Sequence, residues 1–223
     1  MSVTTRPKTL DIKHTVLGPA EHEAVAAVLA GADLSGNAHA VTDYETALRA
    51  WFTSAHAVAC SSGTAALHLA MLALGIGPGD EVIVSAAAPA MTALPVLALG
   101  AVPVFADIAD PTTFALDRDD IAAKTTGRTK AVVTVPMWGY PADGTDFAAA
   151  CAQWGLPLIE DAAQAHGTVV DDRPAGTHAT IGTFSTHARK IMTTGEGGFC
   201  LTGDDALNDR LRQIRNLGRP DAG

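Results

Sequence analysis

The sequence predicts an α/β fold, a three-layer sandwich around a mainly parallel, seven-stranded sheet. Seven short runs rich in Val, Ile, Leu and Ala are spaced along residues 57–202, and segments with a helical pattern separate most of them. These runs are continuously apolar, whereas a strand with one solvated face alternates apolar and polar side chains. Continuous runs are typical of parallel strands that helices cover on both faces.

Two helices are expected before the sheet. Pro19 opens a helical pattern that continues to Leu29 and stops at Gly31. A loop at residues 34–37 leads to a second amphipathic helix at residues 41–52. We therefore expect three parts: an N-terminal helical segment, 1–55, packing on a large domain, 56–217, and a truncated linker, 218–223.

Strands and helices then alternate along the large domain. The last two apolar runs have no helix between them, so a locally antiparallel pair or a departure from strict alternation is expected there. The expected strands are 57–60, 81–85, 102–107, 130–136, 156–161, 179–184 and 198–202, and the expected helices are 65–74, 91–99, 119–126, 146–154 and 205–217.

Composition and charge exclude several classes of protein. No apolar run is long enough to cross a membrane, and residues 1–14 are polar without a signal-peptide pattern. The formal net charge is -9, and the arginines near the C-terminal end have helical spacing. They favour a solvated face or an oligomer contact over nucleic-acid binding. Those four arginines are Arg210, Arg212, Arg215 and Arg219.

The cysteines point to a reducing compartment. Cys60, Cys151 and Cys200 are single and widely spaced, which forms neither a disulfide framework nor a metal site. We expect a soluble, cytoplasmic chain with no metal, membrane or nucleic-acid partner.

Ligands of open α/β sheets bind beyond the carboxyl ends of the strands, so the residues there are the candidate site. Ser62, Gly63 and Thr64 follow the first strand and directly precede a helix. Their amides and hydroxyls suit a phosphate at the helix N-terminus. An ordinary serine N-cap gives the same pattern.

A carboxylate ends the fifth strand. Asp161 lies where a buried strand emerges, which is costly for an isolated charge and favours a cationic partner such as a protonated heterocycle. Gln164 follows three residues later and can present its amide to the same ligand. The alternative is that Asp161 only caps the next helix and that Gln164 is merely polar.

A lysine follows the sixth strand. Ser185 and Lys190 lie in a polar turn that leads into three glycines within four residues, at 195–198. Lysines normally occupy solvated faces, and an ordinary surface lysine is the alternative here. Together, the phosphate cradle, the carboxylate and the lysine are what pyridoxal phosphate requires, because its aldehyde forms a Schiff base with an amine.

The sequence resembles the fold-type-I pyridoxal-phosphate enzymes, in particular the sugar aminotransferase (DegT/StrS-type) family, whose large domain is like that of aspartate aminotransferase. The matching stretches run in the family's order across nearly the whole chain. They are residues 34–36, 60–70, 75–84, 100–107, 159–167, 184–198 and 215–218.

The resemblance implies a role for each matching position. Lys190 would bind the cofactor and move the substrate proton, Asp161 would pair with the pyridine nitrogen, and Gln164 would contact the ring near its phenolic oxygen. Gly63, Thr64 and Ser185 would hold the phosphate, and Asn216 would reach the phosphate of a neighbouring subunit, which implies a dimer. Family members that dehydrate sugars have histidine at the lysine position, so Lys190 favours transamination, with pyridoxamine phosphate as the intermediate form.

Two departures from the family pattern are informative. Pro89 takes the place of an aromatic residue that stacks on the cofactor ring, and so provides only an apolar face. His187 and Arg189 lie in an unusual form of the lysine turn. They are candidates to meet a carboxylate or phosphate of the substrate, and pairing with local acids is the alternative.

Length is the larger departure, because the family's small C-terminal domain is not in this sequence. We expect either a half-enzyme completed by a homologous chain, as a homodimer or heterodimer, or a fragment, or a cofactor-binding remnant. The expected function is transfer of an amino group from glutamate or glutamine to a keto-sugar or keto-cyclitol. The alternative is a non-catalytic or regulatory subunit that stabilises a full-length paralogue.

Overall fold

The protein is organised around a mixed sheet, as the sequence predicts. The computed structural model describes residues 17–140 and 144–219. Within them, seven strands pair in the order β1-β9-β8-β5-β4-β2-β3. These strands are β1 (His56–Cys60), β2 (Glu81–Ser85), β3 (Val102–Ala106), β4 (Thr129–Thr134), β5 (Leu158–Asp161), β8 (Ile181–Ser185) and β9 (Gly198–Thr202).

One strand runs against the others. β9 lies between β1 and β8 and is antiparallel to both, while β8, β5, β4, β2 and β3 pair in parallel. Only a loop joins β8 to β9, and a parallel pair would need a longer crossover. Phe184 and Phe199 face each other in this register, with stacked rings 4.6 Å apart. The expected antiparallel pair is confirmed.

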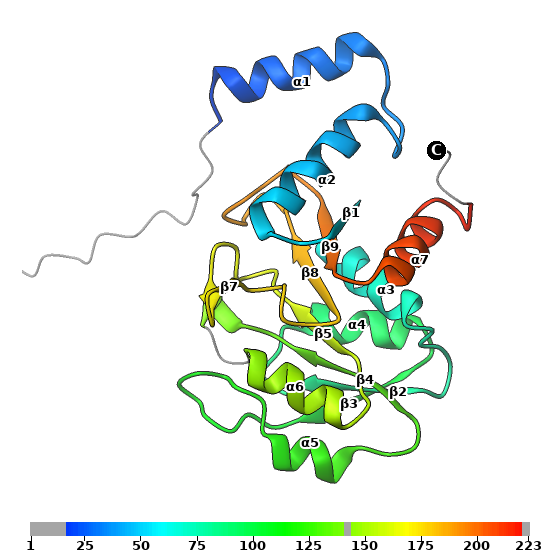
Figure 1. Cartoon of the computed structure of the whole chain (residues 1–223), viewed down its shortest axis with the longest axis vertical. Coiled ribbons are helices and arrows are strands. Elements are labelled where there is room, and N and C mark those ends of the chain that lie inside the picture. Colours follow the sequence, from blue (N-terminus) through cyan, green and yellow to red (C-terminus); the bar gives the residue numbers. More distant parts are fainter. Residues whose placement is uncertain (1–16, 141–143, 220–223) are drawn as a thin grey trace, which may run out of the picture.

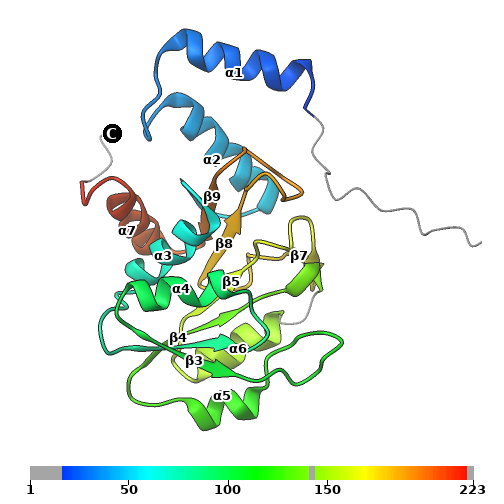
Figure 2. The same ribbon diagram turned by 180° about the vertical axis from the view of Figure 1, so that it is seen from behind.

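Helices cover both faces of the sheet, which confirms the three-layer fold (Figures 1 and 2). Val82 and Val84 of β2 pack in one apolar cluster, while Ile83 between them faces another. The first face carries α3 (Gly63–Ala73), α4 (Ala90–Ala98) and α7 (Asp205–Arg215), and the second carries α2 (His39–Phe52), α5 (Arg118–Lys124) and α6 (Thr145–Gln153).

Short elements complete the fold. A single 3-10 turn, η1 (Met137–Gly139), follows β4, and a two-stranded hairpin of β6 (Val169–Val170) and β7 (Arg173–Pro174) precedes β8. None of these was expected from the sequence, because elements of two or three residues leave no periodic pattern.

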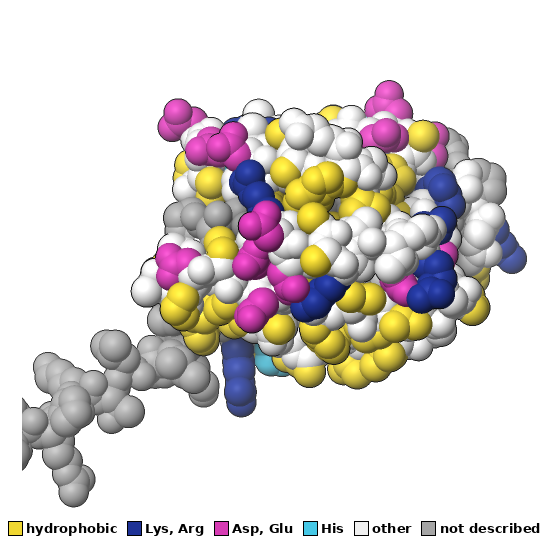
Figure 3. All heavy atoms as spheres, turned by 90° about the horizontal axis from the view of Figure 1, so that it is seen from below, with side chains coloured by type: hydrophobic (Ala, Val, Ile, Leu, Met, Phe, Trp, Pro, Cys, Tyr) yellow, Lys and Arg dark blue, Asp and Glu magenta, His cyan; other side chains and the backbone are white. Residues whose placement is uncertain are grey.

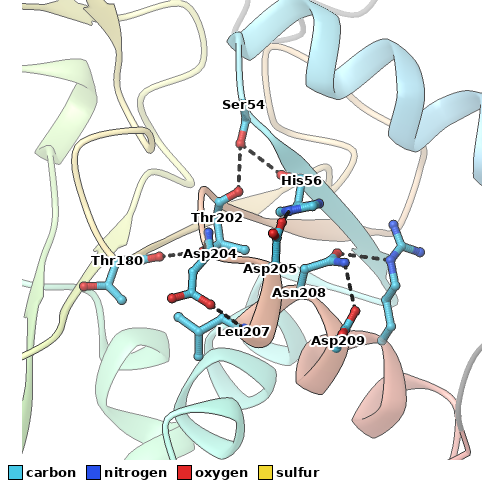
Figure 4. A network of polar contacts seen from close by, with 10 residues as sticks. Ser54, His56, Thr180, Thr202, Asp204, Asp205, Leu207, Asn208 and Asp209 are labelled. Carbon is cyan, nitrogen blue, oxygen red and sulfur yellow. Dashed lines mark hydrogen bonds and ion pairs between the residues drawn. The ribbon is translucent and has the colours of Figure 1, made fainter.

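Helix α7 is anchored to the edge of the sheet by polar contacts. Asp204 caps the helix by accepting from the backbone N–H of Leu207, and Asp205 lies 2.7 Å from His56 of β1 (Figure 4). The β9 residue Thr202 donates to the carbonyl of Thr180 in the same network.

A buried ion cluster corrects one expectation. Arg212 and Arg215 were expected on a solvated face or at an oligomer contact, but both pair with Glu45 of α2, which is 4% exposed. A buried carboxylate needs charged or hydrogen-bonding partners. These arginines therefore tie α7 to α2 within the chain.

The two helices of the N-terminal segment differ in how they pack. Helix α2 buries Leu48 and Phe52 against the sheet. In contrast, α1 (Pro19–Gly31) has no buried residue, and it stands apart from the sheet in both views (Figures 1 and 2). Its apolar side chains have no facing surface in the described residues. The expectations for residues 1–16 and for 220–223 of the linker lie outside the described residues.

The surface is mixed in character. Seen from below, charged side chains of both signs are interspersed with apolar ones (Figure 3). Among the described residues, no helix combines the length and the apolar character needed to cross a bilayer.

Candidate active site

A cavity of about 430 Å³ opens beyond the carboxyl ends of the parallel strands. Its size lies within the usual range for small-molecule sites. Residues at or just after the ends of β1, β2, β4, β5 and β8 line it. It brings together ten residues predicted from the sequence: Ser62, Gly63, Thr64, Pro89, Asp161, Gln164, Ser185, His187, Arg189 and Lys190.

One end of the cavity is formed by the start of α3 against the end of β8. Ser62 is the N-cap of α3, because its hydroxyl accepts from the backbone N–H of Ala65 at 3.0 Å. The capping alternative therefore holds, and Ser62 lines the cavity as well. A Cβ on Gly63 would lie 2.5 Å from the Cβ of Ser185. Only glycine allows this approach, and the residues at the start of α3 line the cavity, where the helix N-terminus favours an anion.

A buried carboxylate forms the floor. Asp161 is 6% exposed and has two donors: the Thr92 hydroxyl reaches Oδ2 at 2.7 Å, and the Ala163 backbone N–H reaches Oδ1 at 3.3 Å. Burial raises the pKa of Asp161 above its ordinary value, and the Thr92 hydroxyl, the Ala163 amide and the Lys190 charge oppose that rise. Such a group favours a cationic ligand atom over water. No regular helix follows β5, so helix capping is not its role.

Lys190 lies in the same cavity and is half-buried. Burial lowers the pKa of its amine, and the Asp161 carboxylate partly offsets this effect. A lowered pKa increases the neutral, nucleophilic fraction of the amine. Burial and placement therefore favour a functional lysine over an ordinary surface lysine.

The loop that carries Lys190 is closed at its base. The Thr186 N–H donates to the Gly197 carbonyl at 2.8 Å, and the hydroxyls of Thr186 and Thr194 are 2.7 Å apart. Gly197 has φ 157°, and a Cβ there would lie 2.5 Å from both hydroxyl oxygens. These contacts hold the two ends of the loop together, so the backbone that carries Lys190 is fixed at both ends.

Gln164 and Pro89 are far apart in the sequence, and both line the cavity. The Gln164 side-chain oxygen accepts from the Trp138 backbone N–H at 3.1 Å, which orients the amide. Pro89 is the N-cap residue of α4 and offers an apolar ring without side-chain hydrogen bonds.

The rim is formed by the two unusual residues of the lysine turn. The His187 Nε2 lies 3.5 Å from the Glu196 carboxylate, so His187 pairs with a local acid, as the alternative stated. Its Nδ1 accepts from the Arg189 backbone N–H at 3.2 Å. Arg189 is exposed and also lines the cavity.

Asn216 does not line this cavity. It is the C-cap residue of α7, where its backbone N–H donates to the Arg212 and Gln213 carbonyls. Its predicted contact with a second subunit is not tested by a single chain. Within the described ranges, no cluster of three His, Cys, Asp or Glu side chains is placed to hold a metal ion.

Sequence reasoning missed several residues of the site. Leu67, Met91 and Val135 line the cavity, Glu196 lies at the rim, and Thr92 supports Asp161 from behind. Thr92 left one signal, a lone polar residue in the apolar helix after β2.

The whole-chain comparison agrees with this geometry. A model of the DegT/DnrJ/EryC1/StrS aminotransferase family matches residues 16–223. The chain belongs to this family. The homologues of the DegT/DnrJ/EryC1/StrS family are pyridoxal-phosphate-dependent aminotransferases of sugar and natural-product biosynthesis.

Two curated relatives illustrate the similarity. The chain is 45% identical over 165 residues to an L-glutamine:2-deoxy-scyllo-inosose aminotransferase from Streptomyces kanamyceticus, covering 74% of this chain and 38% of the relative. It is 41% identical over 178 residues to a GDP-perosamine synthase from Caulobacter vibrioides, covering 80% and 48%. The chain thus spans less than half the length of these relatives.

Solved structures of the family share the fold. A 3-amino-5-hydroxybenzoic acid synthase matches with a TM-score of 0.87 at 35% identity, over 93% of this chain and 55% of that chain. The sugar aminotransferase CalS13 from Micromonospora echinospora matches with a TM-score of 0.87 at 36% identity, over 96% and 60%.

Proposed function

We propose that this chain is the cofactor-binding part of a pyridoxal-phosphate-dependent aminotransferase that moves an amino group from an amino acid to a keto-sugar or keto-cyclitol. The observation that carries the proposal is the meeting of a half-buried lysine and a buried carboxylate in one cavity, beside an open helix N-terminus. Lys190, Asp161 and the start of α3 supply these three features.

The donor set fits pyridoxal phosphate. The glycine-only approach of Gly63 to Ser185 brings the start of α3 against the end of β8, and the α3 amides at this side of the cavity suit the phosphate. Asp161 suits the protonated ring nitrogen, and Gln164 lies three residues further on to contact the ring substituent. Pro89 offers an apolar surface to one face of the ring.

The cofactor, when bound, supplies an electron-withdrawing ring that stabilises negative charge on the substrate carbon. The protein's residues have separate tasks. The Asp161 carboxylate would favour a proton on the ring nitrogen. The Lys190 amine would hold the cofactor, and once released from it would take and return the proton at the substrate carbon, as a base and then as an acid.

The substrate class and the partner are also proposals. The two curated relatives are named for a cyclitol ketone and a nucleotide sugar, which supports a keto-cyclitol or keto-sugar acceptor and a glutamine or glutamate donor. His187 and Arg189 at the rim suit a carboxylate or phosphate of those substrates. Asn216 is proposed to contact the cofactor of a homologous chain in a dimer.

Covalent binding of pyridoxal phosphate tests the proposal. The full chain incubated with the cofactor should turn yellow, and borohydride should fix the cofactor mass on the peptide that contains Lys190. Lys190→Ala should abolish both signals, while Lys130→Ala, at an exposed lysine of β4, should leave them intact. A wild-type chain that stays colourless and gains no mass in excess cofactor would contradict the proposal.

Amino transfer itself needs a second assay. Transfer from isotope-labelled glutamine or glutamate to keto-cyclitols and keto-sugars should be followed by mass, with and without a homologous full-length chain. Activity that appears only with that chain supports a shared site. If this chain binds cofactor but adds no activity in any mixture, the non-catalytic alternative holds.

A further inference from the structure

Thr92 is a fully buried polar residue behind the proposed cofactor site. It lies in the first turn of α4, has 0% exposure, and its hydroxyl lies 2.7 Å from Oδ2 of Asp161. The two residues are 69 positions apart in the sequence, so the contact joins the start of α4 to the end of β5. A buried side-chain hydrogen bond to a charged group is of the stronger kind.

The contact completes the donor set of the carboxylate. Thr92 donates to Oδ2 and the Ala163 amide donates to Oδ1, so each oxygen has one protein donor. An ionised carboxylate accepts at about four positions, whereas a protonated one must also donate. Two fixed donors therefore favour the ionised form and fix the carboxyl plane. Asp161 also lines the cavity, where a cationic ligand atom would meet the carboxylate.

The same turn of α4 also shapes the cavity. The Thr92 backbone N–H donates to the Pro89 carbonyl at 2.9 Å, and Pro89 and Met91 line the cavity while Thr92 points away from solvent. One helical turn thus holds both an apolar wall and the partner of the carboxylate. A shift of this turn would move both.

We propose that Thr92 is a positioning residue, whose hydroxyl favours the ionised form of Asp161 and aims its carboxylate at the ring nitrogen of the bound cofactor. This inference rests on the proposed function. It assigns a role to the Thr92 hydroxyl that packing alone would not require, since valine has nearly the same shape.

Two cofactors and three variants test this role. Thr92→Val removes the hydroxyl, Thr92→Ser keeps it, and Thr202→Val is the matched control, because Thr202 is another buried threonine whose hydroxyl donates to a backbone carbonyl at 2.9 Å (Figure 4). Dissociation constants are measured by fluorescence for pyridoxal phosphate and for its 1-deaza analogue, which has a C–H in place of the ring nitrogen.

Thr92→Val should raise the dissociation constant of pyridoxal phosphate by about tenfold or more, as expected for a lost hydrogen bond to a charged group. It should raise the dissociation constant of the 1-deaza analogue by no more than about twofold, because that analogue has no ring nitrogen for Asp161 to contact. Thr92→Ser should retain affinity within about threefold, and Thr202→Val should match the wild type. If Thr92→Val does not fold, Thr92→Ala takes its place.

An equal loss of affinity for the two cofactors in Thr92→Val would show a structural effect and overturn the inference. An affinity of Thr92→Val equal to that of the wild type would also overturn it. A wild-type chain that binds neither cofactor would overturn the proposed function and this inference with it. The pH at which the bound cofactor changes its absorbance should also shift in Thr92→Val and stay in place in Thr202→Val.

Discussion

Single residues around the cavity show how burial sets charge. His166 packs edge-on against Phe184, with ring centroids 5.3 Å apart, and its Nε2 is buried without a hydrogen-bond partner among the described residues. Burial lowers the pKa of His166 to about 4, and the nearby Lys190 amine adds to the effect. His166 is therefore neutral where Lys190 would act, which avoids a second positive charge beside the amine.

This shift predicts how stability depends on pH. The pKa of His166 lies below its ordinary value of 6.5 in the folded state, so between about pH 4 and 6.5 the unfolded chain binds more protons. The free energy of unfolding should fall as pH falls through this window, by at most about 1.4 kcal/mol per pH unit from this residue. Urea denaturation of wild type and His166→Gln at several pH values measures it.

The variant should lose less stability than wild type between pH 6.5 and 4.5, because glutamine does not titrate. His22→Gln, in the exposed helix α1, is the control and should follow the wild-type pH dependence. Parallel curves for wild type and His166→Gln would contradict the assignment.

Pairs of elements define the end of the cavity at Gly63 and Ser185. The sequence predicts the helix after β1 and the strand before Lys190 separately. Only their packing brings Gly63 of α3 against Ser185 of β8, at a distance that excludes a side chain. The motif of small residues after β1 thus has a steric cause in another element.

Gly63→Ala tests this contact. The added methyl group must displace Ser185, so we expect a loss of about 1–3 kcal/mol in the free energy of unfolding, as for other overpacked sites, together with weaker pyridoxal phosphate binding. Gly127→Ala is the matched control, because a Cβ there meets nothing within 4 Å. It should be neutral or up to about 1 kcal/mol more stable. Equal denaturation midpoints for the two variants would refute the steric argument.

At the scale of the whole molecule, the two N-terminal helices differ in what holds them. α2 is fastened by Leu48 and Phe52 in the core and by the ion pairs of Glu45 with α7. α1 has none of its residues buried, although Val25 and Leu29 are apolar and about 60% exposed. The stability of the described fold therefore depends on α2 and not on α1.

Matched leucine truncations measure this difference. Leu48→Ala should lower the free energy of unfolding by about 2–5 kcal/mol, the range for buried leucines. Leu29→Ala should change it by no more than about 0.5 kcal/mol. Denaturation should be followed at two protein concentrations, since a stability change that depends on concentration reports burial against another chain. Equal losses in dilute protein would show that α1 is packed on the domain.

The sequence alone determined the strands, the antiparallel pair and the candidate residues at the strand ends. Strands buried on both faces must be continuously apolar, and a ligand site at the ends of such strands must draw on the polar residues that directly follow them. Both signals are local, so Lys190, Asp161 and Gly63 could be found without coordinates.

Tertiary structure alone decided the contacts between distant segments. The Thr92 hydroxyl on Asp161, the pairing of Glu45 with Arg212 and Arg215, and the exposure of α1 have no local pattern. The pattern of a helix predicts which of its faces is apolar but not which surface will cover that face. A polar residue in an apolar segment indicates that a partner is needed but not where that partner lies. The covering surface and the partner are known only from the tertiary structure, because they depend on which elements pack together.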